Sequence, residues 1–361
     1  MLEKTRVAVI YGGRSPEHSI SCITARSIIK AMDPEKYEIF PVGITRTGRW
    51  TVGALDPVGV ESLPEVSEEN LEITLSLASA TKGQFFSLTD ASLVAEVDLI
   101  FPVMHGPYGE DGTIQGLFEL SGIPYVGCGV LASATGMDKE FTKKLMQQAG
   151  IPITREVVLH AGEELSAKQL EYLGLPVFIK PARGGSSIGI SKVNTAAELE
   201  AAIATAFEYD TKIVVEAEIK GSEIEVGVLQ YPDGKILASV PAQLLGTADS
   251  TEGFYGFSAK YLDGQVAAAI PAQIPPAAAK EIQELAIKAF QAIDGTGIAR
   301  VDFFLTPNGP LLNEINTLPG FTDISMYPKV FAATGITYPQ LIETLIQTAL
   351  AEKNKQKAGK L

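Results

Sequence analysis

The chain contains little cysteine. Its 361 residues include only Cys22 and Cys128, which lie far apart and lack the spacing of metal ligands. A disulfide framework or a zinc site is therefore not expected. No apolar run reaches the length of a membrane span, and the first six residues lack the pattern of a secretory signal. We therefore expect a soluble, cytoplasmic protein without a membrane partner.

Basic residues are outnumbered. With 29 lysines and arginines against 43 aspartates and glutamates, the formal net charge at pH 7 is −14. Nucleic-acid binding relies on basic patches that neutralise phosphates, and such patches are not evident in the sequence. We therefore expect no nucleic-acid partner. An anionic substrate would need a local concentration of positive charge.

Two common nucleotide-binding patterns are absent. The chain has no G-x-x-x-x-G-K-[ST] motif, and no G-x-G-x-x-G follows its first expected strand, which excludes a Walker A loop and the dinucleotide fingerprint. A different glycine-rich loop is present, because an apolar strand ends at Lys180 and glycines and serines follow at 184–189. Such a loop lets backbone N–H groups and the lysine approach a polyphosphate. The alternative is a flexible hairpin with an exposed lysine.

The order of the expected elements favours an α/β fold. A strand at 6–11, a helix at 15–32 and a strand at 37–44 are typical of a parallel, doubly wound sheet. Residues 51–93 have weak periodicity and are interpreted as an insertion of uncertain structure. A helix at 139–149 is expected to open a new domain, and the chain length predicts two or three domains. Further expected elements are a strand at 97–104, a helix at 113–121, a strand at 212–221, a helix at 338–351 and a fraying polar tail at 353–361.

A polar pair stands in an apolar strand near the C-terminus. Glu314 and Asn316 lie two residues apart at 311–318, so their side chains share one face of the strand. The preceding segment, 299–305, also reads as a strand, and the Pro-Asn-Gly sequence at 307–309 predicts a turn between the two. The sequence therefore predicts a hairpin.

The register of this hairpin decides which side chains meet. With a three-residue loop and Gly309 left-handed, Asp302 lies opposite Glu314 and Arg300 lies opposite Asn316. Two carboxylates and a carboxamide oxygen are hard ligands that suit Mg²⁺. A four-residue loop would shift the register and separate the four residues. The alternative to a metal site is a solvated hairpin face with an incidental ion pair.

A third chemical signal follows the strand at 212–221. A strand that turns away from its sheet frees backbone N–H and C=O groups, which can pair with the edge of an adenine. Glu223 comes just after the turn and could hold ribose hydroxyls. The alternative is an ordinary acidic hairpin.

These signals occur in the order seen in ATP-grasp enzymes, and the chain closely resembles the D-alanine–D-alanine ligases of peptidoglycan synthesis over nearly its whole length. The most specific segments are 12–21, 105–112, 137–139, 180–189, 259–261 and 313–325. The resemblance implies an N-terminal doubly wound parallel domain (1–137) followed by a two-lobed ATP-grasp fold (138–221 and 222–361). A lid loop is implied at 246–264, and a homodimer through the N-terminal domain is implied as well.

The resemblance also implies the reaction. ATP phosphorylates the carboxylate of one D-alanine, a second D-alanine attacks the D-alanyl phosphate, and ADP and phosphate are released. Two Mg²⁺ or Mn²⁺ ions would lie between Asp302, Glu314 and Asn316, with Glu314 bridging them. The ATP-binding residues implied by the resemblance are Lys139, Lys180 and Lys260 at the phosphates, Glu216, Ala217 and Ile219 at the adenine, Glu223 at the ribose, and Phe304.

The same resemblance assigns substrate contacts. Glu17 would bind the ammonium group of the first D-alanine beside His105, and Ser186 would link Glu17 to Tyr261 of the lid. Taken singly, Glu17 could be a carboxylate favoured by a helix N-terminus, His105 a structural residue and Ser186 a turn residue. The remaining contacts implied are Arg300 and the Gly320 N–H at the acyl oxygen, and Ser325 with Met326 at the second D-alanine.

Two other functions stay open. A sibling ligase would use D-lactate or D-serine as the second substrate, although the family pattern at Lys260 and Tyr261 favours the dipeptide. A nucleotide-responsive binding protein without catalysis would keep Lys180 and Glu223 but would need no metal ligands. The set of carboxylates around Arg300 speaks against that function.

Overall fold

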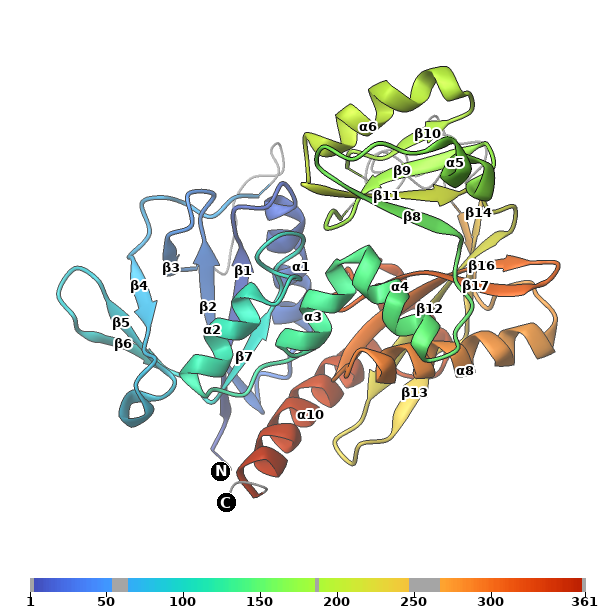
Figure 1. Ribbon diagram of the computed structural model, residues 1–361. Helices are drawn as coiled ribbons and strands as arrows, with labels where there is room; N and C mark the ends of the chain where they lie inside the picture. The colour runs from blue at the N-terminus through green and yellow to red at the C-terminus, as the bar shows by residue number, and fades with distance from the viewer. Residues whose placement is uncertain (1–2, 54–63, 186–187, 247–266, 359–361) are drawn as a thin grey trace.

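The computed structural model describes residues 3–53, 64–185, 188–246 and 267–358. Four β-sheets with helices packed against them make up this part of the chain (Figure 1). The N-terminal sheet lies apart from the other two large sheets, and the chain between them runs through three helices. The α/β class expected from the sequence is confirmed.

The first sheet contains three parallel strands and one antiparallel edge strand, in the order β3-β2-β1-β7. Its strands and the helix after β1 are β1 (Thr5–Gly12), α1 (His18–Ala31), β2 (Tyr37–Ile44), β3 (Trp50–Val52) and β7 (Leu99–Pro102). The expected parallel start is confirmed. Helix α1 begins later than residue 15, because residues 15–17 form a turn in which the His18 amide donates to the Ser15 carbonyl at 3.1 Å.

The segment interpreted as an insertion, 51–93, overlaps a small sheet that spans 73–96. Its three antiparallel strands are β4 (Ile73–Leu75), β5 (Gln84–Ser87) and β6 (Leu93–Glu96), with a short 3-10 helix, η1 (Ser79–Thr81), between the first two. A bridge between Thr51 and Glu72 links this sheet to the first one. Weak sequence periodicity here reflects strands of only three or four residues.

Three successive helices follow: α2 (Thr113–Ser121), α3 (Val130–Met137) and α4 (Lys139–Gln148). The expected helices at 113–121 and 139–149 are confirmed, whereas α3 was not predicted. Asp138 separates α3 from α4, and its Oδ1 accepts a bond from the Phe141 amide at 3.4 Å, which caps α4. This cap fixes the point at which Lys139 enters the cleft described below.

The second sheet is antiparallel, in the order β10-β9-β11-β8. Its elements are β8 (Glu156–His160), α5 (Ala167–Leu173), β9 (Val177–Pro181), β10 (Ser191–Val193), η2 (Ala196–Glu198), α6 (Leu199–Phe207) and β11 (Lys212–Ala217). Buried alanines of α6 pack on Val177, Ile179 and Val215 of this sheet. The expected strand at 212–221 ends early, at Ala217.

The third sheet has the order β15-β14-β12-β16-β17, with β13 beside β12. Its strands are β12 (Ser222–Gln230), β13 (Ile236–Ala238), β14 (Ala242–Leu245), β15 (Ala267–Ala269), β16 (Ile298–Thr306) and β17 (Gly309–Asn316), and its helices are α8 (Pro276–Ala292), α9 (Met326–Ala333) and α10 (Tyr338–Ala358). Ile282 and Ala286 of α8 pack on Val226 and Val301 of the sheet.

The β16–β17 hairpin has the predicted pairings but not the predicted turn. Arg300 pairs with Asn316 and Asp302 with Glu314, as expected. The loop between the paired Thr306 and Gly309 has two residues rather than three. A bulge at Asp302/Phe303 supplies the missing residue in β17 and restores the register.

One hydrophobic core joins the two ends of the chain. Val7 and Leu99 of the first sheet are buried together with Ile342 and Leu345 of α10, which runs beside β7 in Figure 1. Helix α10 continues to Ala358, so the fraying tail predicted at 353–361 is wrong for residues 353–358. Residues 359–361 lie outside the described residues. Glu, Lys, Gln and Ala are strong helix formers, and Lys355 also pairs with Glu352 at 2.8 Å.

The packing around β12 gives a stability prediction. A Cβ on Gly227 would lie 2.6 Å from Cε2 of Phe331 and 3.2 Å from Cδ2 of Tyr327, and both rings are fully buried. We therefore expect Gly227→Ala to lower the free energy of unfolding in urea by about 1–3 kcal/mol. Gly116→Ala in α2 is the control, because nothing lies within 4 Å of its Cβ and alanine favours a helix by about 1 kcal/mol. Equal losses in the two variants would contradict the prediction.

Candidate active site

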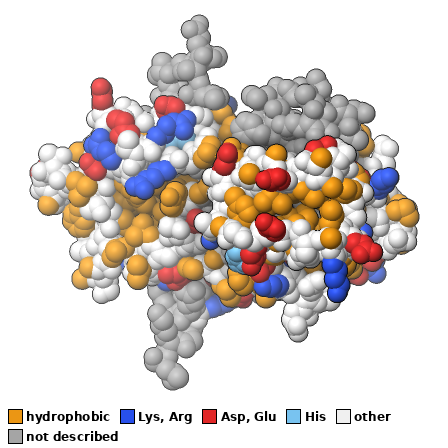
Figure 2. Space-filling model, turned by 45° about the horizontal axis from the view of Figure 1, so that its top comes forward, with side chains coloured by type: hydrophobic (Ala, Val, Ile, Leu, Met, Phe, Trp, Pro, Cys, Tyr) orange, Lys and Arg blue, Asp and Glu red, His pale blue; other side chains and the backbone are white. Residues whose placement is uncertain are grey.

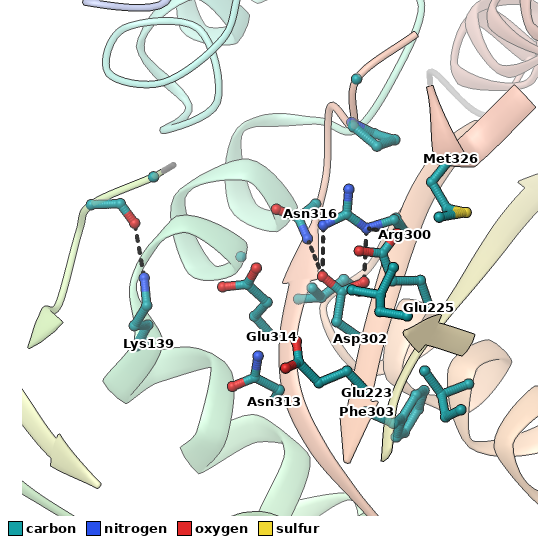
Figure 3. A pocket seen from close by; sticks show the side chains of 18 of the residues that line it. Lys139, Glu223, Glu225, Arg300, Asp302, Phe303, Asn313, Glu314, Asn316 and Met326 are labelled. Carbon is teal, nitrogen blue, oxygen red and sulfur yellow. Dashed lines mark hydrogen bonds and ion pairs between the residues drawn. The ribbon is translucent and has the colours of Figure 1, made fainter. Parts of the chain in front are cut away.

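A cleft of about 950 Å³ is lined by residues of the second and third sheets, of α1, α3 and α4, and of the segment that follows β7 of the first sheet. Figure 3 looks into it, with the β16–β17 hairpin at its centre and Lys139 on one side. The cleft lining contains these sequence-predicted site residues: Glu17, His105, Lys139, Lys180, Glu216, Ala217, Ile219, Glu223, Arg300, Asp302, Phe304, Glu314, Asn316, Gly320, Ser325 and Met326. Ser186, Lys260 and Tyr261 lie outside the described residues, as does nearly all of the expected lid at 246–264.

Asp302 and Arg300 form the centre of the cleft. The Arg300 Nε and Nη2 donate to the two Asp302 oxygens at 2.8 and 2.6 Å, and the Asn316 amide donates to Asp302 Oδ2 at 3.1 Å. Glu225 Oε2 lies 3.4 Å from Arg300 Nε. Although burial would lower it, the charges of Asp302, Glu225 and Glu314 raise the pKa of Arg300. Arg300 is therefore a fixed positive charge.

Glu225 was not predicted. It lies on β12, directly across from Asp302 on β16, and its side chain is almost fully buried. The sequence contains a signal for Glu225, because Glu223 and Glu225 are two residues apart and therefore share one face of the strand, as Glu314 and Asn316 do. What the sequence could not show is that β12 pairs with β16.

The bulge in β17 adds another residue to the cleft. Asn313 and Glu314 both line it, although neighbouring strand residues normally point to opposite faces. Figure 3 shows the side chains of Asn313, Glu314 and Glu223 in the same part of the cleft. The bulge therefore concentrates polar oxygens at the point where the hairpin faces the cleft.

Two lysines supply positive charge on the other side of the cleft. Lys139 Nζ donates to the Gly184 carbonyl at 2.8 Å, and Lys180 Nζ lies 2.8 Å from Glu216 Oε2. Burial lowers the pKa of Lys139. It would also lower the pKa of Lys180, but Glu216 raises that pKa above its usual value. The face shown in Figure 2 carries both basic and acidic side chains. The local positive charge expected for an anion site comes from Lys139 and Lys180 in the cleft.

Glu17 and His105 occupy the end of the cleft nearest the first sheet, and both are buried. The ring of His105 has its Nε2 3.3 Å from Thr24 Oγ1 and its Nδ1 3.7 Å from Glu110 Oε1. Although burial would lower it, the two glutamates raise the pKa of His105. A Cβ on Gly106 would lie 2.7 Å from Glu17 Oε2. Glu110 was not singled out from the sequence, although it belongs to the 105–112 segment.

The segment after β17 turns tightly. Ser325 precedes the first residue of α9, and its Oγ accepts from the Thr322 amide at 3.0 Å and lies 2.7 Å from Thr322 Oγ1. A Cβ on Gly320 would lie 3.3 Å from Ser325 Oγ. Glycine therefore brings the backbone close to the serine hydroxyl at the edge of the cleft.

The donor atoms of the hairpin suit a hard cation. Asp302, Glu314 and Asn316 offer two carboxylates and a carboxamide, and the Asn316 amide group is oriented by Asp302. Within the described ranges, no group of three or more His, Cys, Asp or Glu side chains has the spacing of a metal site. A cation held by this hairpin would therefore take its remaining ligands from phosphates and water.

Comparisons with known proteins give one family. Residues 6–128 match the family described as D-ala D-ala ligase N-terminus, and residues 145–347 match D-ala D-ala ligase C-terminus. The chain is 57% identical over 350 residues to the D-alanine–D-alanine ligase of Corynebacterium diphtheriae, covering 96% of each chain. It is 51% identical over 357 residues to that of Nocardia farcinica, covering 97% of this chain and 98% of the relative.

Solved structures agree. The D-alanine–D-alanine ligase of Coxiella burnetii has a TM-score of 0.85 and 33% identity, covering 99% of this chain and 97% of that one. The VanG D-Ala:D-Ser ligase of Enterococcus faecalis has a TM-score of 0.84 and 37% identity, covering 96% and 100%. These neighbours confirm the ATP-grasp fold. None of the helices in the described part of the chain is both long and apolar enough to cross a membrane.

Proposed function

The chain belongs to the D-alanine–D-alanine ligase family, and we propose that it joins two D-alanines into D-alanyl-D-alanine for peptidoglycan precursors while converting ATP to ADP and phosphate. One observation carries the proposal. A single cleft contains two lysines that could bind phosphate, the β16–β17 hairpin with its carboxylates around Arg300, and the buried side chains of Glu17 and His105. Phosphoryl transfer followed by amide formation requires cations, metal ligands and an amino-acid site close together.

The proposed reaction has two steps. The carboxylate of the first D-alanine attacks the γ-phosphorus of ATP, which yields D-alanyl phosphate and ADP. The amine of the second D-alanine then attacks the acyl carbon, and phosphate leaves as the amide bond forms. A carboxylate is a poor acyl donor at neutral pH, so the phosphoryl group provides the leaving group.

The ATP site is proposed along β9, β11 and β12. Lys139 and Lys180 would donate to phosphate oxygens, with Lys260 as a third cation. The other proposed ATP contacts are Glu216, Ala217 and Ile219 at the adenine, Glu223 at the ribose, and Phe304. All of these except Lys260, which lies outside the described residues, line the cleft.

Asp302, Glu314 and Asn316 are the proposed ligands of two Mg²⁺ or Mn²⁺ ions. Such ions would neutralise the negative charge of the β- and γ-phosphates. The hairpin contributes rigidity, because paired strands hold these side chains on one face. Arg300 donates to both oxygens of Asp302 and thereby orients that carboxylate.

The substrate contacts form the rest of the proposal. Glu17 would bind the ammonium group of the first D-alanine beside His105. Arg300 and the Gly320 N–H would stabilise the negative charge that develops on the acyl oxygen. The second D-alanine would bind at Ser325 and Met326. Ser186 would connect Glu17 to Tyr261 of the lid, which would exclude water from the acyl phosphate.

The larger organisation is proposed on family grounds. We propose domains at 1–137, 138–221 and 222–361, a lid at 246–264, and a cytoplasmic homodimer that forms through the N-terminal domain. The core shared by the first sheet and α10 supports close packing between the first and third of these domains.

Phosphate release from ATP tests the function directly. We expect release to require both D-alanine and Mg²⁺, and to produce D-alanyl-D-alanine detectable by mass spectrometry, because the metal and amino-acid sites serve one reaction. L-alanine is the matched control. ATP binding without D-alanine-dependent release would instead indicate a nucleotide-binding protein without ligase activity.

A second acceptor is worth testing, because the chain is 37% identical to a structure named a D-Ala:D-Ser ligase. Parallel assays with D-alanine, D-serine and D-lactate across pH would compare the acceptors. We propose D-alanine as the preferred acceptor, and a higher kcat/KM for either competitor would overturn that choice.

A further inference from the structure

Lys143 is a buried ammonium group behind the cleft. It follows Lys139 by four residues on α4, so both side chains leave the same face of the helix. Its side chain is only 1% exposed. Its Nζ lies 2.6 Å from Thr154 Oγ1 and 3.1 Å from Glu156 Oε2, and it also bonds Glu216 Oε1. Two of the three donors of this ammonium group bond Thr154 and Glu216. Glu156 adds an ion pair, and among the described residues its Oε2 accepts no hydrogen bond.

Glu216 is shared between two lysines. One carboxylate oxygen accepts from Lys143, and the other lies 2.8 Å from Nζ of Lys180, which lines the cleft. Although burial would raise it, the charges of Lys143 and Lys180 hold the pKa of the Glu216 carboxyl far below its usual range. Glu216 is therefore an ionised carboxylate within the protein, balanced from both sides.

We propose that Lys143 is a positioning residue for ATP, which shares the Glu216 carboxylate with Lys180 and thereby leaves Lys180 able to bind phosphate. This inference rests on the proposed function, which assigns the phosphates of ATP to Lys180. Lys143 itself contacts neither the nucleotide nor the reacting atoms in this proposal.

The physical reason is competition for one carboxylate. A buried ion pair is much stronger than a pair in water, so Lys180 paired to an unshared Glu216 would give up that partner reluctantly. With Lys143 on the other oxygen, the negative charge of Glu216 is already balanced when Lys180 turns toward a phosphate. The formal charges of Lys143 and Lys180 balance those of Glu216 and Glu156, although burial raises the pKa of Glu156.

A purely structural role would have a different signature. Lys143 joins α4 to β8 and β11 through its bonds to Glu156 and Glu216, and removing one member of a buried pair destabilises a fold. Such a loss would affect both substrates alike. The proposal instead predicts an effect on ATP.

The first test is Lys143→Met. We expect KM for ATP to rise by about 10-fold or more, as when a supporting residue behind a ligand site is removed, while KM for D-alanine stays near its wild-type value. Titration with ATP alone should show the same loss of affinity. Lys144→Met is the matched control, because its side chain is 60% exposed and lies outside the cleft lining, so both KM values should stay near those of the wild type.

Two double variants distinguish two explanations: Lys143 frees Lys180 from Glu216, or Lys143 only balances the charge of the buried cluster. They also test the proposal if the Lys143→Met single variant does not fold. The double variant Lys143→Met/Glu216→Gln keeps the charged side chains of Lys180 and Glu156. The double variant Lys143→Met/Glu156→Gln keeps those of Lys180 and Glu216. Each buried set is neutral. Each double variant is compared with its own Glu→Gln single variant, which by itself carries any loss of the proposed adenine contact of Glu216. We expect Lys143→Met to cause little further loss of ATP affinity in the Glu216→Gln background, and a loss of about 10-fold in the Glu156→Gln background.

The same further loss of ATP affinity when Lys143→Met is added to either single variant, or an unchanged KM for ATP in Lys143→Met, would overturn the proposal. Failure of the proposed function would look different. In that case the wild-type protein would release no D-alanine-dependent phosphate, whereas ATP titration of the variants would still report on Lys143.

Discussion

Glu314→Gln is expected to lower D-alanine-dependent phosphate release by more than about 100-fold, exceeding the loss typical of residues that only support a metal ligand. Glu314 is the proposed bridging ligand, and the neutral amide of glutamine would bind a divalent cation more weakly than a carboxylate does. Because β17 holds the side chain on the cleft face of the hairpin, the substitution leaves its position unchanged. Steady-state rates across a Mg²⁺ titration measure the effect, and the loss should be greatest at limiting Mg²⁺.

Glu284→Gln provides the control. This glutamate lies on α8 with a side chain that is 66% exposed, outside the lining of the cleft. It loses the same charge without altering the hairpin, so its rate should match that of the wild type. A near-normal rate for Glu314→Gln at limiting Mg²⁺ would remove Glu314 from the metal site.

Arg300→Lys is expected to reduce kcat by about 100-fold or more, which is the effect of removing one preorganised group that stabilises a developing oxyanion. Lysine keeps the positive charge but cannot donate two parallel bonds to Asp302 as Arg300 does. The cation would therefore lose its fixed direction. Because the phosphate lysines are untouched, KM for ATP should change far less than kcat.

Arg6→Lys is the matched control for Arg300→Lys. Arg6 makes the same two-bond contact with Asp98, at 3.1 and 2.7 Å, in the first sheet and outside the cleft. Arg6→Lys should leave kcat unchanged and lower the free energy of unfolding by no more than about 1 kcal/mol. Equal activity in Arg300→Lys and Arg6→Lys would remove Arg300 from the reaction.

The hairpin illustrates how far local patterns reach. Alternation along two strands correctly predicted that Arg300, Asp302, Glu314 and Asn316 share a face. The turn was predicted wrongly, and the correct pairings arose because a bulge added the residue that the shorter loop lacks. A bulge depends on how two strands fit together, so the alternation of either strand alone does not reveal it. Asn313 was missed as a cleft residue for this reason.

The charged partners of the site residues also could not be predicted from the sequence. Glu225 reaches Arg300 because β12 pairs with β16, and Lys143 reaches Glu216 because α4 packs near β11. Both are ordinary charged residues in the sequence. Their importance comes from burial, since an ionised group removed from water must find an opposite charge.

The sequence by itself determined the family, the α/β class, the parallel start and 16 of the residues that line the cleft, because short motifs and strand alternation are local properties of the chain. Only the tertiary structure decided the bulge that completes the hairpin, the core that joins the first sheet to α10, and the buried counter-ions of Arg300 and Lys180. These depend on contacts between distant segments. Such contacts are selected by the packing and charge balance of the whole fold.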